Sequence, residues 1–197
     1  MYPATLERLV EYFKLLPSVG QKNAERYAMR ILEMDPQTAQ DFAGQIVKVI
    51  RSVKRCPVCG NLTEKEVCEI CSDNSRDKSV ICVVEEAKDV IAIEKLEQYH
   101  GLYHVLNGVI SPSKGVMPED INIESLFARL NEDIKEIVIA TNATLEGETT
   151  ASYLTKVLKK YPYITITRLA SGLPMGSNLD YADPLTLLKA FNGRIKQ

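Results

Sequence analysis

The sequence predicts an α/β fold, in which a mostly parallel sheet with flanking helices is preceded by a small helical domain and a four-cysteine module. Three observations predict this order. Apolar residues at helical spacing fill residues 6–50, two CxxC pairs follow, and short β-branched runs then alternate with helical segments. Strands that alternate with helices favour right-handed crossovers, so the later part of the chain should hold one sheet covered by helices.

The composition is that of a globular chain with an uneven charge distribution. Of the 197 residues 45% are hydrophobic, enough for a sizeable core, and no apolar run is long enough to span a membrane. Glu7 and Arg8 interrupt the start where a signal peptide needs an apolar segment, so we expect a cytoplasmic protein without membrane contact. Residues 1–55 carry nine Lys and Arg against six Asp and Glu, although the whole chain has a net charge of -2. The amino-terminal part is therefore the side expected to face a polyanion.

Three helices are predicted at the start of the chain. Thr5 can cap the first, and the turn formed by residues 17–20 ends it. The second runs from about Gln21 to Met34 and ends before a proline, which disfavours helix in the residue that precedes it. The third covers residues 37–53, with a predicted core face of Phe42, Ala43, Ile46, Val47 and Ile50. Lys48, Arg51, Lys54 and Arg55 crowd its end, where they either complement the helix dipole or extend a phosphate-binding surface.

The second helix carries three cations at steps of four residues, Lys22, Arg26 and Arg30. A basic stripe alone is best explained as a solvated face. The preceding turn, Leu-Pro-Ser-Val-Gly over residues 16–20, changes the balance because it resembles the helix-hairpin-helix motif of DNA-binding proteins. There, backbone N–H groups around Gly20 and the positive end of the helix can meet a phosphate without reading the base sequence. Ser18 departs from the common motif, which has glycine at that place, and positive φ costs serine more.

Four of the five cysteines form two CxxC pairs, Cys56 with Cys59 and Cys68 with Cys71, separated by eight residues. Each pair can present two thiolates to one ion, and four thiolates complete the closed tetrahedral shell of structural zinc. A redox pair would need only one CxxC in a thioredoxin-like context, and the odd number of cysteines disfavours a disulfide framework. Cys82 lies within an apolar strand and is interpreted as a buried small hydrophobic residue.

The remaining elements alternate along the chain. Strands are predicted at 80–84, 103–106, 137–141 and 163–169, and helices at 87–96, 123–130, about 149–160 and, after the Asp183-Pro184 cap, near the end. The strand at 137–141 is almost wholly apolar, as expected of a strand buried on both faces. Gly147 is expected to let the backbone turn before the helix that begins near Thr149.

Polar side chains follow two of these strands. Asn142, Thr144, Glu146 and Glu148 occupy alternate positions after one strand, and Glu85 follows another. Carboxyl ends of parallel strands are where open α/β sheets place their sites, so these groups are candidates for a metal or partner site. The simpler interpretation of Glu146 and Glu148 is that they favour the positive start of the next helix.

The segment Ala-Thr-Asn-Ala-Thr-Leu-Glu-Gly-Glu-Thr-Thr-Ala, residues 140–151, resembles the Toprim signature of topoisomerases and primases, and Glu85 matches the other signature acid of that fold. With the hairpin, the cysteine pairs and residues 103–112 and 168–176 in this order, the chain is similar to the RecR family of bacterial recombination mediators. This resemblance implies a helix-hairpin-helix domain at 1–54, a zinc module at 55–76, a Toprim domain at 77–172 and a tail at 173–197 that contacts another subunit.

The resemblance also implies a function. Members of this family are non-enzymatic DNA-binding proteins that act with RecO, and in many bacteria with RecF, to help load RecA onto SSB-coated single-stranded gaps. They form dimers and ring-like tetramers that can clamp single-stranded or double-stranded DNA without sequence preference. The DNA-contacting positions would be Gly20, Lys22 and Arg26, with Arg30 added from spacing, and the zinc ligands would be Cys56, Cys59, Cys68 and Cys71. The residual Toprim positions Glu85, Asn142, Thr144, Glu146 and Glu148 would serve for partner binding. Such a protein acts in the bacterial cytoplasm, at the nucleoid.

Two alternatives stay open. Active Toprim enzymes hold magnesium with two aspartates at places that correspond to Asn142 and Thr144, and magnesium prefers charged oxygen ligands, so bound magnesium is doubtful. Glu85 and the retained Leu-Glu-Gly-Glu of residues 145–148 nevertheless allow a magnesium-dependent nuclease or primase. A purely structural zinc protein would leave the cations of the second helix unexplained.

Overall fold

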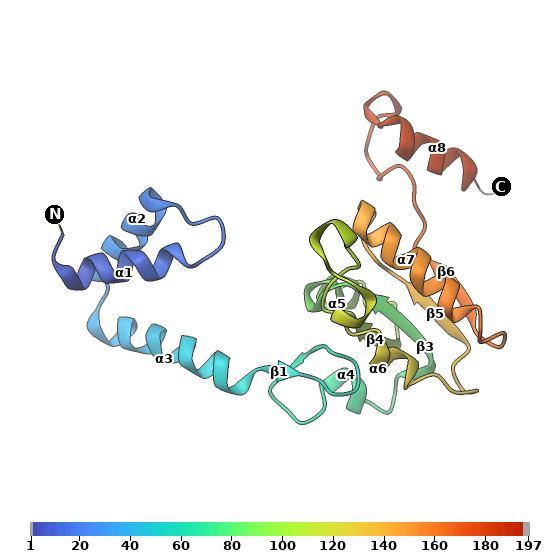
Figure 1. Cartoon of the computed structure of the whole chain (residues 1–197), viewed down its shortest axis with the longest axis horizontal. Helices are drawn as coiled ribbons and strands as arrows, with labels where there is room; N and C mark the ends of the chain where they lie inside the picture. The colour runs from blue at the N-terminus through green and yellow to red at the C-terminus, as the bar shows by residue number, and fades with distance from the viewer. Residues whose placement is uncertain (1, 195–197) are drawn as a thin grey trace. The chain divides into compact units, whose positions relative to one another are not determined.

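The computed structural model describes residues 2–194 and contains two compact units, one that ends at Val53 and one that begins at Lys54 (Figure 1). The first unit is helical. The second contains the four cysteines and a four-stranded parallel sheet with flanking helices, so the predicted fold class is confirmed. The finer division into domains at 54, 76 and 172 stays a prediction.

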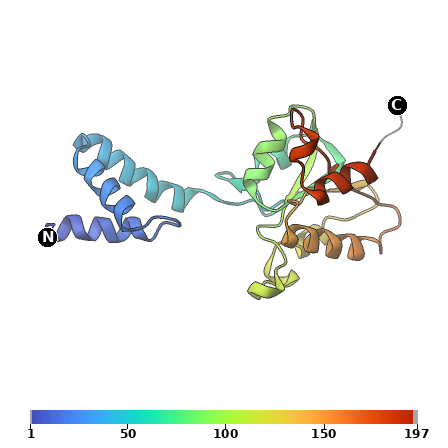
Figure 2. The same cartoon turned by 90° about the horizontal axis from the view of Figure 1, so that it is seen from above.

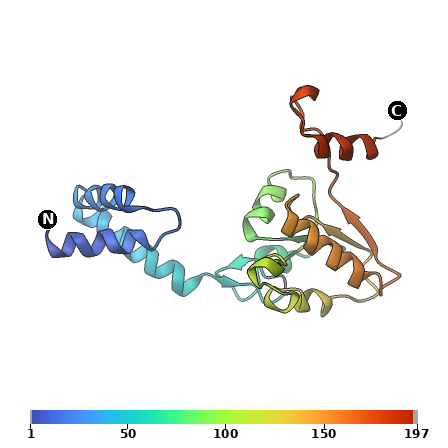
Figure 3. The ribbon, with the colours of Figure 1, turned by 45° about the horizontal axis from the view of Figure 1, so that its top comes forward.

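The first unit contains three helices, α1 (Ala4–Lys14), α2 (Gln21–Leu32) and α3 (Pro36–Ser52). Helices α1 and α2 lie side by side, joined by the predicted turn (Figure 3), and bury Val10, Ala24 and Ala28 between them. The two alanines allow a close approach because they place only a methyl group in the contact. The predicted cap at Thr5 is wrong: α1 begins at Ala4, after Pro3, so Thr5 is itself helical, and no side chain caps the helix.

The predicted core face of α3 is wrong for the single chain. Ala43 is exposed, and the exposed fractions of the four larger residues are 47% for Phe42, 50% for Ile46, 46% for Val47 and 77% for Ile50. Helical periodicity predicts that one face of a helix is apolar, but it does not predict which element packs against that face. In this unit α1 and α2 cover each other, and the apolar side of α3 stays in contact with solvent.

The sheet of the second unit has the order β4-β3-β5-β6, and all its neighbours are parallel, as predicted. Its strands are β3 (Asp77–Val84), β4 (Gly101–Val105), β5 (Glu136–Ile139) and β6 (Thr165–Arg168). The central strands β3 and β5 pair Ile81 with Ile137 and Val83 with Ile139. Strand order places the carboxyl ends of β3 and β5, followed by Glu85 and Asn142, side by side.

Helices cover both faces of this sheet (Figure 2). On one face Ile81 and Val83 pack with α6 (Glu124–Phe127) and α7 (Leu145–Leu158). On the other face Val84 packs with α5 (Ala87–Glu94). Successive strand residues point to opposite faces, so the apolar run of β3 supplies both layers. Cys82 lies in the second layer with 2% of its surface exposed, which confirms its interpretation as a core residue.

The cysteine segment contains β1 (Lys54–Arg55), β2 (Leu62–Thr63) and α4 (Glu69–Ser72), and it contacts the edge strand β4. The Val105 N–H donates to the carbonyl of Cys59 at 2.7 Å, and the Asn107 amide donates to the carbonyl of Gly60 at 3.2 Å. Gly60 has φ 75, and a Cβ there would lie 2.6 Å from the Val105 oxygen, so glycine is required for this approach. The segment thereby covers part of an otherwise open sheet edge.

After β6 the chain runs through η3 (Leu179–Tyr181) to α8 (Pro184–Asn192). The Asp183 side chain accepts from the N–H groups of Leu185 and Thr186, and Pro184 is the first helical residue, which confirms the predicted cap. The apolar residues Leu185, Leu188 and Phe191 are each more than half exposed. Within residues 2–194, no helix has the length and apolar character needed to cross a bilayer.

Helix α7 begins at Leu145, four residues before the predicted start near Thr149. Gly147 was expected to form a turn, but it lies in the first helical turn and its N–H donates to the hydroxyl of Thr144 at 3.1 Å. A Cβ on Gly147 would lie 2.1 Å from the Asn142 carbonyl oxygen and 2.7 Å from a Glu85 carboxylate oxygen. Glycine is therefore present because the helix packs directly against the strand ends.

Gly147→Ala should destabilise the second unit by about 2 to 3 kcal/mol, because the added methyl group has no space without a shift of backbone. Denaturant unfolding followed by circular dichroism measures the change. Ser152→Ala on the exposed side of the same helix is the matched control and should stay within about 0.5 kcal/mol of wild type. Wild-type stability of Gly147→Ala would contradict the close approach.

Candidate zinc centre, basic hairpin and acidic strand-end site

The turn between α1 and α2 has the conformation in which the common motif uses glycine. Ser18 has φ 63, in the left-handed region, and the Val19 N–H donates to the Leu16 carbonyl at 3.2 Å. A left-handed residue with a Cβ costs about 1 to 2 kcal/mol, so the serine keeps the turn at some cost. Gly20 then forms the N-cap of α2 and offers no side chain to its first N–H groups.

The three cations predicted to contact DNA all lie exposed on α2. Arg26 lies over the ring of Tyr27, 5.6 Å from its centroid, and Arg30 pairs with Glu33 at 3.3 Å. Lys22 lies in the first turn, close to the positive end of the helix. The Arg30–Glu33 pair is exposed on both sides, so it holds Arg30 only weakly.

The sulfur atoms of Cys56, Cys59, Cys68 and Cys71 all lie within 4.8 Å of one another, and none is in a disulfide. In a tetrahedral site with Zn–S bonds of about 2.3 Å, neighbouring sulfur atoms are about 3.8 Å apart. Cys59 and Cys68 approach to 3.5 Å, and the Cys68 N–H donates to the Cys56 sulfur at 3.4 Å. Four soft donors on two short knuckles fit zinc and leave no coordination position open, which supports a structural zinc ion.

The thiols of this group already differ in acidity. Burial raises the pKa of Cys56, but backbone N–H groups of Cys68, Cys59 and Val58 donate to its sulfur and bring the pKa down to about 7. A hydrogen bond with Cys71 and then burial raise the pKa of Cys59, and burial raises that of Cys68 to about 11. A divalent cation among four sulfur atoms favours the thiolate at each of them, so metal binding supplies the charge that the thiols lack.

Glu85 lies directly after β3 with 7% of its surface exposed. Its carboxylate accepts two hydrogen bonds from one residue, the backbone N–H of Asn142 at 2.8 Å and the Asn142 side-chain amide at 2.5 Å. Hydrogen bonds to an ionised group are the strong ones, and a buried carboxylate requires them. Asn142 thus gives Glu85 two N–H donors, at one of the places where the resemblance to the Toprim signature leads us to expect an aspartate.

The other predicted residues of the strand-end site have separate partners. The Thr144 hydroxyl caps α7, and the Thr141 hydroxyl donates to the Gly147 carbonyl at 3.0 Å. Both hydroxyl groups therefore contribute to the start of the helix.

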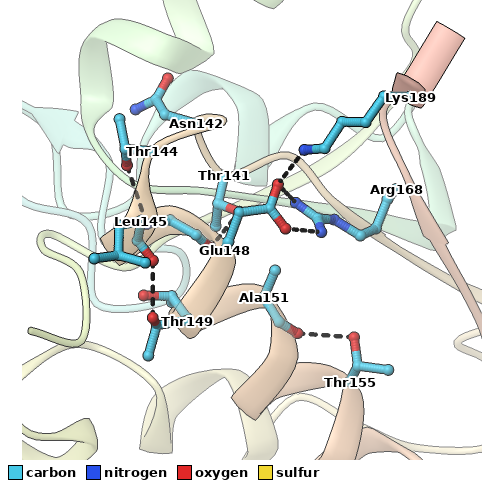
Figure 4. A network of polar contacts seen from close by, with 12 residues as sticks. Thr141, Asn142, Thr144, Leu145, Glu148, Thr149, Ala151, Thr155, Arg168 and Lys189 are labelled. Carbon is cyan, nitrogen blue, oxygen red and sulfur yellow. Dashed lines mark hydrogen bonds and ion pairs between the residues drawn. The ribbon is translucent and has the colours of Figure 1, made fainter. Parts of the chain in front are cut away.

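Glu146 and Glu148 lie in the first turn of α7, and both are paired with basic side chains from distant segments. Figure 4 shows Glu148 with its two partners, Arg168 and Lys189. The backbone N–H of Glu146 has the largest effect on its own carboxyl group and lowers the pKa. Lys114, whose Nζ lies 3.0 Å from the Glu146 carboxylate, lowers this pKa further. Arg168 at 2.7 Å and Lys189 at 3.1 Å hold the Glu148 carboxylate and lower its pKa in that order. The carboxylates of Glu146 and Glu148 are thus already paired with basic side chains of the same chain.

Among residues 2–194, the four cysteines are the one set of three or more metal-ligating side chains whose donor atoms come together. Glu85, Glu146 and Glu148 do not form such a set, although they share one end of the sheet. The strand-end site therefore consists of one buried carboxylate with neutral donors and two surface carboxylates in ion pairs.

Several polar residues of these sites gave no signal in the sequence. Lys189 is 41 positions from Glu148 and Lys114 is 32 positions from Glu146, separations that no helix or strand period connects. His104 is fully buried in β4, where burial lowers its pKa to about 4. Its Nε2 donates to the Asn122 carbonyl at 2.6 Å and its Nδ1 accepts from Arg129 at 3.2 Å, which defines the neutral tautomer.

Comparison with known proteins gives matches along nearly the whole chain. Residues 6–50 match the helix-hairpin-helix model of RecR, residues 53–73 its four-cysteine zinc finger domain, residues 79–170 a Toprim domain, and residues 172–195 the RecR C-terminal model. A protein of Enterococcus faecalis named Recombination protein RecR is 52% identical over 194 residues, 98% of either chain. One of Clostridium perfringens with the same name is 47% identical over 193 residues, 98% of this chain and 97% of the relative.

Asn142→Asp should destabilise the protein by about 1 to 3 kcal/mol at neutral pH, since it removes a side-chain donor to the buried Glu85 carboxylate and places a second carboxylate beside it, although position 142 itself is exposed. Millimolar magnesium should recover part of this loss, because a cation can bind between two carboxylates. Thermal unfolding with and without magnesium chloride measures both effects.

Asn131→Asp is the matched control, because Asn131 is exposed and its side-chain oxygen accepts from the N–H of Asp133, which aspartate also allows. It should unfold like wild type with or without magnesium. An Asn142→Asp variant that is as stable as wild type in the absence of magnesium would contradict the role given to the Asn142 amide.

Proposed function

Since the chain belongs to the RecR family of recombination proteins, we propose that it binds DNA as a clamp-like homo-oligomer and acts with RecO, and with RecF, to help load RecA onto SSB-coated single-stranded gaps. A role in recombination and repair follows from the family. The observation that carries the mediator role is the division of charge between the units: exposed cations on the hairpin, and a strand-end site whose acids already have partners.

DNA binding is proposed for the turn and α2. Gly20 leaves the first N–H groups of the helix without a side-chain cap, so they can meet a phosphate oxygen. Lys22, Arg26 and Arg30 follow on exposed positions of the same helix. Contacts of this kind go to the backbone of DNA and not to base edges, which fits sequence-independent binding to single and double strands.

A non-catalytic Toprim domain is proposed from the geometry around Glu85. The carboxylate is nearly buried and hydrogen-bonded by Asn142, and Thr144 caps a helix. Magnesium chemistry on DNA needs carboxylates that share a cation in reach of a phosphate. We assign Glu85 to holding the loop before α7, and partner contact to Glu146 and Glu148, whose side chains are 29% and 35% exposed.

Assembly into dimers or tetramers is proposed from two apolar surfaces. One is the exposed face of α3, and the other is the face of α8 formed by Leu185, Leu188 and Phe191. Apolar faces of this kind on separate elements favour burial against further copies of the chain. Two surfaces per chain permit closed assemblies larger than a dimer.

The alternative function is a magnesium-dependent nuclease or primase. The match to a Toprim domain and the retained Glu85 favour it. Incubation of the pure protein with nicked, gapped and single-stranded DNA in magnesium or manganese tests it. Cleavage or synthesis that Glu85→Ala abolishes would replace the mediator proposal.

Lys22→Ala combined with Arg26→Ala should weaken DNA binding by at least about tenfold near 0.1 M salt. The slope of the logarithm of the binding constant against the logarithm of the salt concentration should fall in magnitude by about two, because each cation releases the counterions of one phosphate. Fluorescence anisotropy over a salt series measures both quantities. Arg8→Ala combined with Lys14→Ala on α1 removes the same charge from the same unit and should change binding much less. Equal losses in the two double variants would contradict a defined contact surface.

Ile46→Glu should shift the assembly toward smaller species, because it places a charge in the apolar face of α3. Light scattering over a concentration series measures the mass. Gln45→Glu, on the same helix and also exposed, adds the same charge outside that face and should leave the mass unchanged. A wild-type monomer at every concentration would exclude the clamp.

A further inference from the structure

Arg129 follows α6 in the second unit, and its partly buried side chain reaches strand β4. Its Nη1 group donates to the Tyr103 carbonyl at 2.7 Å and to Nδ1 of His104 at 3.2 Å. Both acceptors are uncharged, since the buried imidazole donates at Nε2 and accepts at Nδ1 and so carries only one N–H. The guanidinium therefore has hydrogen bonds but, from these two residues, no neutralising charge.

No aspartate or glutamate within residues 2–194 forms an ion pair with Arg129. Arg76 shows the usual arrangement, since its partly buried side chain pairs with both Asp73 and Glu94. Arginine does not lose its proton in proteins, and a charge withdrawn from water is normally paired. A negative charge that balances Arg129 would therefore come from a group other than a carboxylate.

The four cysteines are the groups that can supply this negative charge, once they are thiolates. Burial lowers the pKa of Arg129, and thiolates at Cys71, Cys59, Cys56 and Cys68 each raise it. Strand β4 explains the proximity: Tyr103 and His104 hold the guanidinium, and the next residue, Val105, donates its N–H to the carbonyl of Cys59. One short stretch of backbone thus fixes both the arginine and the first cysteine knuckle.

We propose that Arg129 is the countercharge of the zinc centre, and that it stabilises the metal-loaded knuckles against β4 without touching the metal. Zinc with four thiolates carries a net charge of about -2, which the surrounding protein has to balance. The guanidinium balances part of it from outside the coordination sphere. Zinc loading and the contact between the cysteine segment and the sheet are then coupled. The inference requires zinc at the four cysteines but does not require DNA binding or any partner protein.

Arg129→Gln and Arg129→Lys separate charge from hydrogen bonding. Glutamine keeps an N–H donor for the Tyr103 carbonyl and removes the charge, whereas lysine keeps the charge. Transfer of zinc from the full-length loaded protein to a chromogenic chelator should be about tenfold or more faster for Arg129→Gln, and within about threefold of wild type for Arg129→Lys. Arg76→Met is the matched control: it removes a partly buried arginine that has its own carboxylates, and zinc transfer should stay at the wild-type rate.

A second measurement distinguishes loss of the countercharge from poor folding of the Arg129→Gln variant. Unfolding temperatures are measured for loaded protein and for protein stripped of zinc by the chelator. Arg129→Gln should lower the unfolding temperature of the loaded form and not that of the stripped form, because the negative charge is present only with metal-bound thiolates. Equal losses in both forms, or zinc transfer at the wild-type rate in Arg129→Gln, would show that Arg129 is only a hydrogen-bond donor to β4 and would overturn the proposal.

Discussion

The second unit is organised around one buried carboxylate. Glu85 ends β3 with little access to water, and it is stable there because Asn142 supplies two N–H donors from the loop after β5. That contact joins the two central strands at their carboxyl ends. It also brings α7 so close that only glycine fits at position 147, and this placement puts Glu146 and Glu148 on the surface at the start of the helix. A change of charge at Asn142 would therefore disturb the loop, the helix and the acidic surface together.

The two units differ in whether their charged side chains have partners within the chain, and this difference matches the function proposed for each unit. On α2 the cations lie exposed, with at most a weak surface pair, so they are free to meet phosphates. In the second unit the acids of the Toprim signature have hydrogen bonds or ion pairs within the chain, and the four cysteines fit a metal that holds the segment next to β4. Carboxylates that have hydrogen-bond or ion-pair partners within the fold are expected of a scaffold protein. Catalysis on DNA instead needs charged groups that are directed at the substrate.

The parts of this structure that were predicted from the sequence depend on local patterns. The CxxC spacing, the apolar runs of the central strands and the Asp183-Pro184 cap each have a short-range physical cause. The errors arose where the outcome depends on distant contacts. Gly147 is predicted to form a turn because its close packing against the strand-end loop cannot be known from the sequence. The apolar face of α3 is predicted to be a core face, but its side chains are exposed. The pairing of Glu148 with Lys189 joins segments 41 positions apart and has no signature in the sequence.

The central proposal is that a hydrogen-bonded amide has replaced a metal ligand beside Glu85. Electron paramagnetic resonance of free manganese, a spectroscopic substitute for magnesium, tests it most directly when zinc-loaded wild-type protein is titrated into millimolar Mn²⁺. The signal of free Mn²⁺ should be the same with wild-type protein as with Glu85→Gln. A loss of free signal in wild type that Glu85→Gln abolishes would show a cation at this carboxylate and would contradict a non-catalytic Toprim domain.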